Sequence, residues 1–197
     1  MITALSKRIS FFLYRKKIVE YESIDVYQYG FEIVISTIIG FLITLVLGLL
    51  FKMVLLSFLY YIIFVTLRQF TGGYHANTYL TCNSIYAFTT IVIFGMTKLS
   101  AYSELYTINF HVTLLIFSVL TVWFCSPIEN KNKPFTEKQK RRNHWCGFLI
   151  TVFLSVISCL LFQMAKSISA LITFTLFIIT LMIVIAIPIG KEVKEHE

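Results

Sequence analysis

Long apolar runs separated by short polar segments dominate this chain. The run over residues 31–67 contains only two charged side chains, Glu32 and Lys52. A helix rises about 1.5 Å per residue and the hydrocarbon layer of a membrane is about 30 Å thick, so this run is too long for a single crossing. We therefore predict two membrane-spanning helices here, over residues 29–47 and 53–70.

Four further apolar segments follow, each about as long as one membrane-spanning helix. They cover residues 80–97, 108–124, 146–165 and 168–189, with a polar loop over residues 126–145. The pattern predicts an all-α polytopic membrane protein with about six transmembrane helices. Because the connections are too short for a separate soluble domain, we expect a single integral membrane domain over residues 1–197.

The segment before the first span mixes apolar and basic side chains at helical spacing. Its apolar members are Ile2, Leu5, Ile9, Phe12 and Leu13, and its basic members are Lys7, Arg8, Arg15, Lys16 and Lys17. We predict an amphipathic helix over residues 1–20 that lies in the membrane interface. The alternative is an ordinary cytosolic segment ahead of the first span.

Composition indicates that lipid, rather than water, is the solvent of this chain. Of its 197 residues, 57% are hydrophobic and 14% are charged, whereas soluble domains carry roughly 25% charged residues. The net charge of +7 lies in patches, which fits contact with the anionic cytoplasmic leaflet of a lipid bilayer. No basic stretch is interleaved with aromatic residues on a polar surface, so we expect no nucleic-acid partner.

The distribution of Lys and Arg predicts the orientation in the membrane. Basic residues are concentrated in residues 1–20 and in the loop 126–145, whereas the connections on the alternate side hold only Lys52, Lys98 and Lys166. Cytoplasmic segments of membrane proteins carry an excess of positive charge. We therefore expect a multi-pass protein of the cell membrane with both termini in the cytoplasm.

The strongest candidate for chemistry is the pair His75 and Cys82, which follows Gly72-Gly73 at the start of the third span. A thiol and an imidazole are the minimum set for a cysteine nucleophile and its base. By the predicted orientation, both lie on the cytoplasmic side. The alternative is a buried structural cysteine and an interfacial histidine.

The spacing of this pair restricts the backbone that joins it. On an unbroken helix, His75 and Cys82 would lie roughly 10 Å apart along the axis, whereas a general base works at about 3 Å from its proton donor. We therefore predict an irregular connection within residues 68–82 that folds back over the first turn of the third span, where Cys82 lies. A helix N-terminus favours the thiolate form of a cysteine.

Glu32 is the one acidic residue inside the first apolar run, close to its cytoplasmic end. Ionisable residues inside membrane spans are candidates for function. Glu32 is a candidate to orient His75 or to receive a positive group of a substrate. The alternatives are a side chain that reaches the lipid headgroups or one that pairs with Arg68.

The remaining cysteines and histidines give weaker signals. Cys125, Cys146 and Cys159 form no CxxC motif, and no His–Cys spacing resembles a structural zinc pattern. We expect no metal site and no cofactor. His111, at the start of the fourth span, is predicted to be an interfacial residue on the outer side.

Two blocks of the sequence stand out. The first consists of Arg68, Gly72-Gly73, His75-Ala76 and Cys82, after two hydrophobic spans. The second is Pro127-Ile128-Glu129-Asn130-Lys131-Asn132-Lys133-Pro134, after the fourth span and before a basic run. Together they resemble the signature of the AgrB family (accessory gene regulator protein B). The length, the basic N-terminal helix and the six-span plan are also similar. Gln69 departs from the pattern, because relatives often carry a second basic residue there.

The resemblance implies a membrane cysteine endopeptidase of Gram-positive quorum sensing. Such an enzyme cleaves the C-terminal part from an AgrD-type propeptide and forms a thioester that leads to a cyclic autoinducing peptide. Cys82 would be the nucleophile and His75 the base, with Arg68, Gly72 and Gly73 shaping the site or holding an oxyanion. Asn130, Lys131 and Lys133 belong to the second block, whose basic residues would attract the acidic C-terminal segment of the substrate. The alternative for this basic loop is a topology signal that contacts lipid headgroups. The other expected partners are the lipid bilayer and a second copy of the chain in a homodimer.

A non-enzymatic membrane protein is the alternative function, as a transporter or as a scaffold for peptide export. A transporter is expected to line a path through the middle of the membrane with polar residues, or to contain inverted repeats with broken helices. The spans contain few polar residues beyond Ser, Thr and Gln163, and no repeat is clear. The enzyme is therefore the favoured interpretation.

Overall fold

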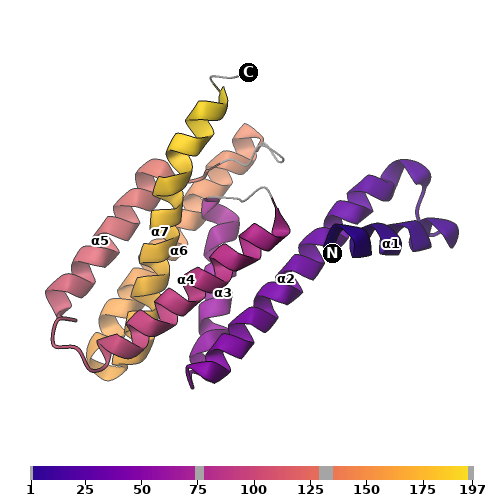
Figure 1. Cartoon of the computed structure of the whole chain (residues 1–197). Coiled ribbons are helices and arrows are strands. Elements are labelled where there is room, and N and C mark those ends of the chain that lie inside the picture. Colours follow the sequence, from indigo (N-terminus) through magenta and orange to yellow (C-terminus); the bar gives the residue numbers. More distant parts are fainter. Residues whose placement is uncertain (1, 74–77, 129–134, 195–197) are drawn as a thin grey trace.

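The computed structural model describes residues 2–73, 78–128 and 135–194, with side chains as far as residue 187. The described residues form α-helices and one short 3-10 helix and contain no strand (Figure 1). The elements are α1 (Ile2–Arg15), η1 (Tyr21–Ser23), α2 (Ile24–Leu50), α3 (Val54–Thr71), α4 (Tyr79–Ser100), α5 (Ile108–Cys125), α6 (Glu137–Met164) and α7 (Lys166–Lys194).

Six helices, α2 to α7, are long and apolar enough to cross a membrane. The all-α class and the six predicted spans are therefore confirmed. Each predicted span lies within or close to one observed helix, because a run of apolar helix-forming residues in lipid must satisfy its backbone hydrogen bonds internally.

The predicted extent of the loop 126–145 is wrong, because α6 begins at Glu137. A capping box starts this helix: the Thr136 hydroxyl accepts from the Gln139 N–H at 3.3 Å, and the Gln139 side chain accepts from the Thr136 N–H at 3.0 Å. Lys138, Lys140, Arg141 and Arg142 thus lie on the helix. Hydropathy marks where apolar residues begin, whereas charged residues with good helix propensity extend the helix beyond that point.

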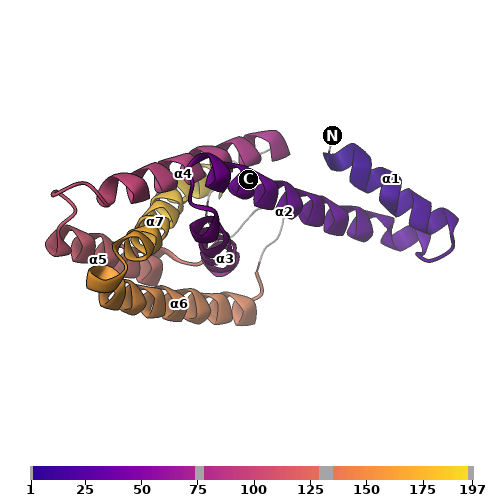
Figure 2. The same cartoon turned by 90° about the horizontal axis from the view of Figure 1, so that it is seen from below.

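The core of the bundle is centred on α7. This helix contacts α3, α4, α5 and α6, and the view from below shows it surrounded by them (Figure 2). It contributes the fully buried Leu171, Leu176, Ile179 and Ile183. Tyr60 and Leu67 of α3 pack into the same core, so the end of α3 is held firmly against the centre of the molecule.

The N-terminal helix and the first part of α2 project away from this bundle (Figures 1 and 2). α1 packs against α2, and α2 contacts α3 and α4. Ser6 and Ser10 are the buried residues of α1, while Leu5, Phe11 and Phe12 are exposed. The helix predicted over residues 1–20 is present as α1, and its position in the membrane interface stays a prediction.

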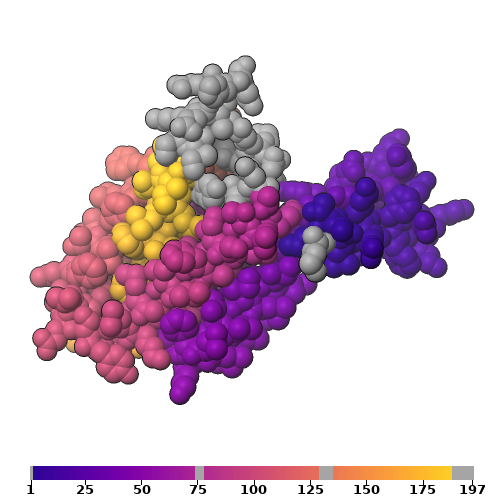
Figure 3. All heavy atoms as spheres, viewed as in Figure 1, coloured from indigo at the N-terminus to yellow at the C-terminus, as the bar shows by residue number. Residues whose placement is uncertain are grey.

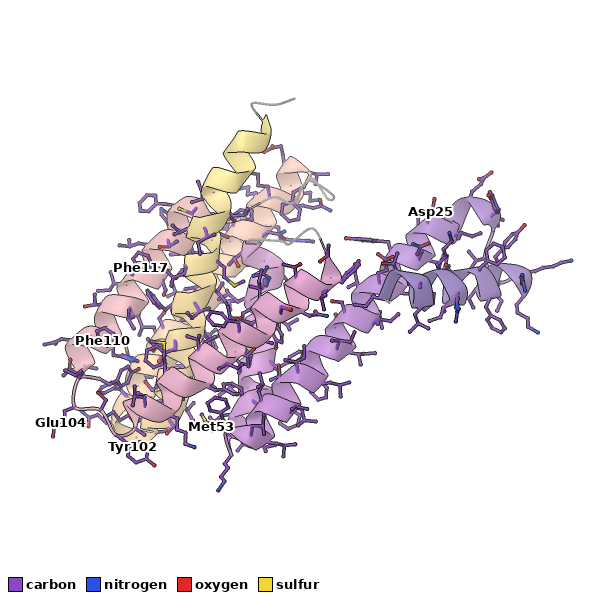
Figure 4. All side chains as sticks on the ribbon, viewed as in Figure 1. Asp25, Met53, Tyr102, Glu104, Phe110 and Phe117 are labelled. Carbon is purple, nitrogen blue, oxygen red and sulfur yellow. The ribbon has the colours of Figure 1, made fainter. Side chains whose placement is uncertain are left out.

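The two ends of the bundle carry different connections. The start of α4 and the start of α6 lie at one end, while Met53, Tyr102 and Glu104 mark the other (Figures 1 and 4). His111 lies toward this second end, but it is fully buried rather than interfacial. Its Nδ1 lies 2.7 Å from the Tyr106 hydroxyl and 3.1 Å from the Thr173 hydroxyl. Hydropathy alone does not show this inward orientation, which depends on the packing of α5 against α7.

Candidate active site

Cys82 lies in the first turn of α4, as the sequence predicted. Thr78 is the N-cap residue: its hydroxyl accepts a hydrogen bond from the Thr81 N–H at 3.2 Å, and its carbonyl oxygen accepts one from the Cys82 N–H at 3.0 Å. The Cys82 side chain is half-buried. The N-terminal end of a helix carries a partial positive charge that favours a thiolate over a thiol.

Arg68, in the last turn of α3, is the basic residue that faces this turn of α4. Its Nη1 donates to the sulfur of Met182 on α7 at 3.2 Å, and its guanidinium lies 5.8 Å from the centre of the Phe64 ring. The guanidinium is near enough to Cys82 for their charges to interact. A fixed positive charge beside a cysteine favours its nucleophilic form.

The two glycines that end α3 adopt conformations that other residues avoid. Gly72 has φ of +71° and Gly73 has φ of +127°, both in the region that favours glycine. A Cβ atom on Gly72 would collide with the carbonyl oxygen of Ile128. A Cβ atom on Gly73 would lie 3.5 Å from Nη1 of Arg68. Gly72 therefore lets the backbone at Ile128 approach the end of α3 closely, while Gly73 leaves room for the Arg68 side chain.

That segment is the start of the second sequence block. The Ile128 N–H donates to the Thr71 carbonyl oxygen at 3.0 Å, and the Ser126 hydroxyl donates to the same oxygen at 3.4 Å. Nδ1 of His144 on α6 in turn donates to the carbonyl oxygen of Ser126 at 2.8 Å. The structure therefore brings the two blocks together, although they lie far apart in the sequence.

Glu32 is buried on α2, with 9% of its surface exposed. Its Oε2 accepts a hydrogen bond from the Tyr79 hydroxyl at 2.7 Å, and its Oε1 accepts from Ser6 at 3.3 Å and from Gln28 at 3.2 Å. The described partners of Glu32 are therefore Tyr79, Ser6 and Gln28, and the alternative in which Glu32 pairs with Arg68 is not observed. The Tyr79 hydroxyl binds the Glu32 carboxyl group because Tyr79 is the first residue of α4, which packs against α2.

Four predicted site residues, His75, Asn130, Lys131 and Lys133, lie outside the described residues. Their roles stay predictions. Within the part of the chain that is described, no group of three or more His, Cys, Asp or Glu side chains could hold a metal ion. Sequence reasoning missed Tyr79, Thr71 and His144, because each acts through a contact with a distant segment and no local motif marks such contacts.

The fold and the site together define a polytopic membrane protein with a half-buried cysteine at a helix N-terminus beside an arginine. The family model described as "Accessory gene regulator B" matches residues 6–187, so the chain belongs to the accessory gene regulator B family.

Two curated relatives support this membership. The chain is 26% identical over 172 residues to the Clostridium perfringens (strain SM101 / Type A) protein named "Putative AgrB-like protein", covering 82% of this chain and 79% of that protein. It is 31% identical over 142 residues to a Clostridium beijerinckii protein of the same name, covering 70% of this chain and 68% of that protein. No solved structure gives a significant match.

Proposed function

We propose that this chain is a membrane cysteine endopeptidase of the accessory gene regulator system. It cleaves the C-terminal part from an AgrD-type propeptide and holds the upstream part as a thioester on Cys82. The observation that carries the proposal is the position of Cys82 in the first turn of α4, within electrostatic reach of Arg68. Membership of the accessory gene regulator B family supports the same conclusion.

In the first half of the proposed reaction, the Cys82 thiolate attacks the carbonyl carbon of the scissile peptide bond. A C–S bond forms, the C–N bond breaks, and the departing amine takes a proton. His75 is proposed to hold that proton, after taking it from the thiol. Arg68 is suited to stabilise the negative charge that develops on the carbonyl oxygen.

In the second half, His75 is proposed to take the proton from a Cys or Ser side chain of the bound peptide, and that side chain attacks the thioester carbon. The new thioester or ester closes a thiolactone or lactone ring, and Cys82 leaves as a thiolate. A thioester retains the reactivity needed for this step, so no ATP is required. Hydrolysis competes wherever water reaches the thioester, and a site at the membrane boundary holds the peptide nucleophile close while it limits water.

The basic start of α6 supports capture of an acidic substrate segment. Arg142 lines a small polar hollow between the end of α3 and the start of α6, together with Gln69, Gln139 and Asn143. We propose that Asn130, Lys131 and Lys133 extend this surface. Attraction between exposed charges is screened by salt, so capture of the acidic segment weakens as ionic strength rises.

The proposed location is the cell membrane, with both termini and the active site on the cytoplasmic side. The described basic residues of α1 and of the first turns of α6 support this orientation, because the opposite connections hold only single lysines, Lys52, Lys98 and Lys166. We also propose that two copies of the chain assemble into a homodimer. Measurement of the mass of the protein in detergent tests this assembly.

The buried hydroxyl groups of the bundle do not support the transport alternative. Thr151, Ser155 and Thr175 donate to carbonyl oxygens of their own helices. Hydroxyl groups satisfied in this way offer no open row of polar groups to a peptide that crosses the membrane. These hydroxyl groups therefore give no support to transport, and the enzymatic function remains the better-supported proposal.

Intact-mass measurement of the protein in liposomes tests the proposed function. Wild type and Cys82→Ala are each incubated with an AgrD-type propeptide that has been shown to bind the membrane. We expect an adduct of the truncated peptide on the wild type only, followed by a product lighter than the linear fragment by one water. Cleavage that survives Cys82→Ala would identify another nucleophile, and the absence of both adduct and cleavage would favour transport or a scaffold.

A further inference from the structure

Three helices meet at the carboxyl group of Glu32, close to the candidate nucleophile. Glu32 belongs to α2, Ser6 to α1 and Tyr79 to α4. The Tyr79 hydroxyl makes the shortest of these hydrogen bonds, at 2.7 Å, compared with 3.3 Å for Ser6. The space-filling view shows α1 and the first turn of α4 next to each other over α2 (Figure 3).

The position of Tyr79 gives this contact a consequence for Cys82. Tyr79 is the first residue of α4, and Cys82 lies in the same turn. The two side chains are near enough to interact electrostatically. Because the backbone of one helical turn moves as a unit, a hydrogen bond that fixes Tyr79 also fixes the direction in which Cys82 points.

Among the side-chain hydrogen bonds between described residues, the one from Tyr79 to Glu32 joins this turn of α4 to another helix. The Thr78 cap acts within α4 itself, and Leu80 and Thr81 are exposed. The hydrogen bond from Tyr79 to α2 therefore stands out as the attachment that sets the distance between Cys82 and Arg68.

We propose that Tyr79 and Glu32 are a positioning pair that holds the nucleophile turn of α4 in its reactive place, and that Ser6 joins the N-terminal helix to this pair. The proposal rests on the proposed function of Cys82. Glu32 acts through Tyr79 and does not touch the reacting atoms. The position of α1 on α2 thereby influences the reactivity of Cys82.

Residue-resolved alkylation tests the pair without any substrate. The protein in liposomes is treated with iodoacetamide over a range of pH, and modification of each cysteine is quantified by peptide mass spectrometry. Cys125, Cys146 and Cys159 serve as internal references. In Tyr79→Phe we expect alkylation of Cys82 at neutral pH to slow by about 3- to 10-fold, because the side chain is no longer held in its place beside Arg68. The reference cysteines should not change.

Matched variants separate positioning from bulk stability. Tyr61→Phe removes a tyrosine hydroxyl that donates to the Thr37 carbonyl oxygen at 3.0 Å, away from Cys82, and should leave alkylation of Cys82 as in wild type. Glu32→Gln keeps an acceptor for Tyr79 and should retain most of the reactivity, whereas Glu32→Leu should behave as Tyr79→Phe does. Cys82 in the double variant Tyr79→Phe/Glu32→Leu should be alkylated no more slowly than in either single variant, because both substitutions remove the same hydrogen bond. Ser6→Ala should give the smallest effect.

Turnover of the propeptide provides the second measurement. In Tyr79→Phe we expect kcat to fall about tenfold with little change in KM, because the pair orients the nucleophile rather than binds substrate. An alkylation rate of Cys82 in Tyr79→Phe equal to that in wild type would overturn the proposal. So would an equal loss of Cys82 reactivity in Glu32→Gln and Glu32→Leu. A rise in reactivity at all four cysteines together would also overturn it. If the wild-type protein does not cleave the propeptide, the proposed catalytic role of Cys82 is wrong. The alkylation measurement still decides whether Tyr79 and Glu32 position Cys82.

Discussion

The end of the bundle that carries Cys82 holds its polar groups differently from the end that carries His111. The Cys82 side chain is only partly enclosed, and Gly72 admits the backbone of Ile128 beside the end of α3. Around His111 the polar groups are shut inside the bundle. The Ser158 hydroxyl lies 2.9 Å from that of Thr173, which in turn contacts His111, and Ser158 also donates to the Ser169 carbonyl oxygen at 2.9 Å.

The difference separates a structural polar network from a chemical one. Enclosed hydrogen bonds in a medium of low polarity are strong and rigid, and they fix how helices pack. No substrate reaches them without unfolding part of the bundle. A half-buried thiol beside a guanidinium remains open to a peptide and is still activated by its surroundings. Four predictions test this contrast, in order of decreasing effect.

The largest effect is expected from Arg68→Leu. Removal of the guanidinium takes away the positive charge beside Cys82, and we expect kcat/KM for propeptide cleavage to fall about 100-fold or more. Lys98→Leu is the matched control, since Lys98 lies in the last turn of α4 at the opposite end. Cleavage assays in liposomes measure both. Equal rates for the two variants would mean that the charge at Arg68 takes no part in the reaction.

Gly72→Ala is expected to have the next largest effect. Its Cβ atom collides with Ile128, and its backbone conformation, with φ of 71° and ψ of −143°, costs an L-residue on the order of 1–3 kcal/mol. We expect a lower unfolding midpoint in detergent and cleavage reduced about tenfold or more, because the two sequence blocks no longer meet. Gly95→Ala is the control, since its Cβ atom enters open space on a helix. Normal cleavage by Gly72→Ala would show that this close approach is dispensable.

His111→Leu should affect stability and leave the chemistry unchanged. The Tyr106 and Thr173 hydroxyls lose their shared partner, which costs about 1–3 kcal/mol of unfolding free energy. Urea or thermal denaturation in detergent measures this loss, and kcat for cleavage is measured at a temperature where the variant is folded. A large fall in kcat with an unchanged free energy of unfolding would show that His111 takes part in the reaction and is not a structural residue.

The smallest effect concerns the pH dependence of stability through Tyr106. Burial, opposed in part by a hydrogen bond from Thr173, raises the pKa of Tyr106 from 10.0 to about 12. The fold thus favours the neutral phenol, so this contribution to stability is complete below pH 10 and is lost as the pH rises through about 12. Tyr106→Phe should flatten the fall in unfolding midpoint over this range. Tyr102→Phe, at a tyrosine that is 83% exposed, should leave the fall as in wild type.

The features that follow from local sequence could be predicted from the sequence. Apolar runs of membrane-crossing length determined the six spans, since hydrocarbon forces each run to satisfy its own backbone hydrogen bonds. The polar residues before the third span placed Cys82 in the first turn of α4. The start of α6 was missed, because a charged helix turn has the same hydropathy as a loop.

The arrangement of the site was decided by the tertiary structure. Arg68 lies near Cys82 only because α3 and α4 both pack against α7. Tyr79 reaches Glu32 only because α2 lies against α4. The meeting of Gly72 with Ile128 and the burial of His111 likewise depend on helices that are distant in the sequence. Hydropathy and capping describe one segment at a time, whereas these contacts depend on how side chains of several helices fill shared space.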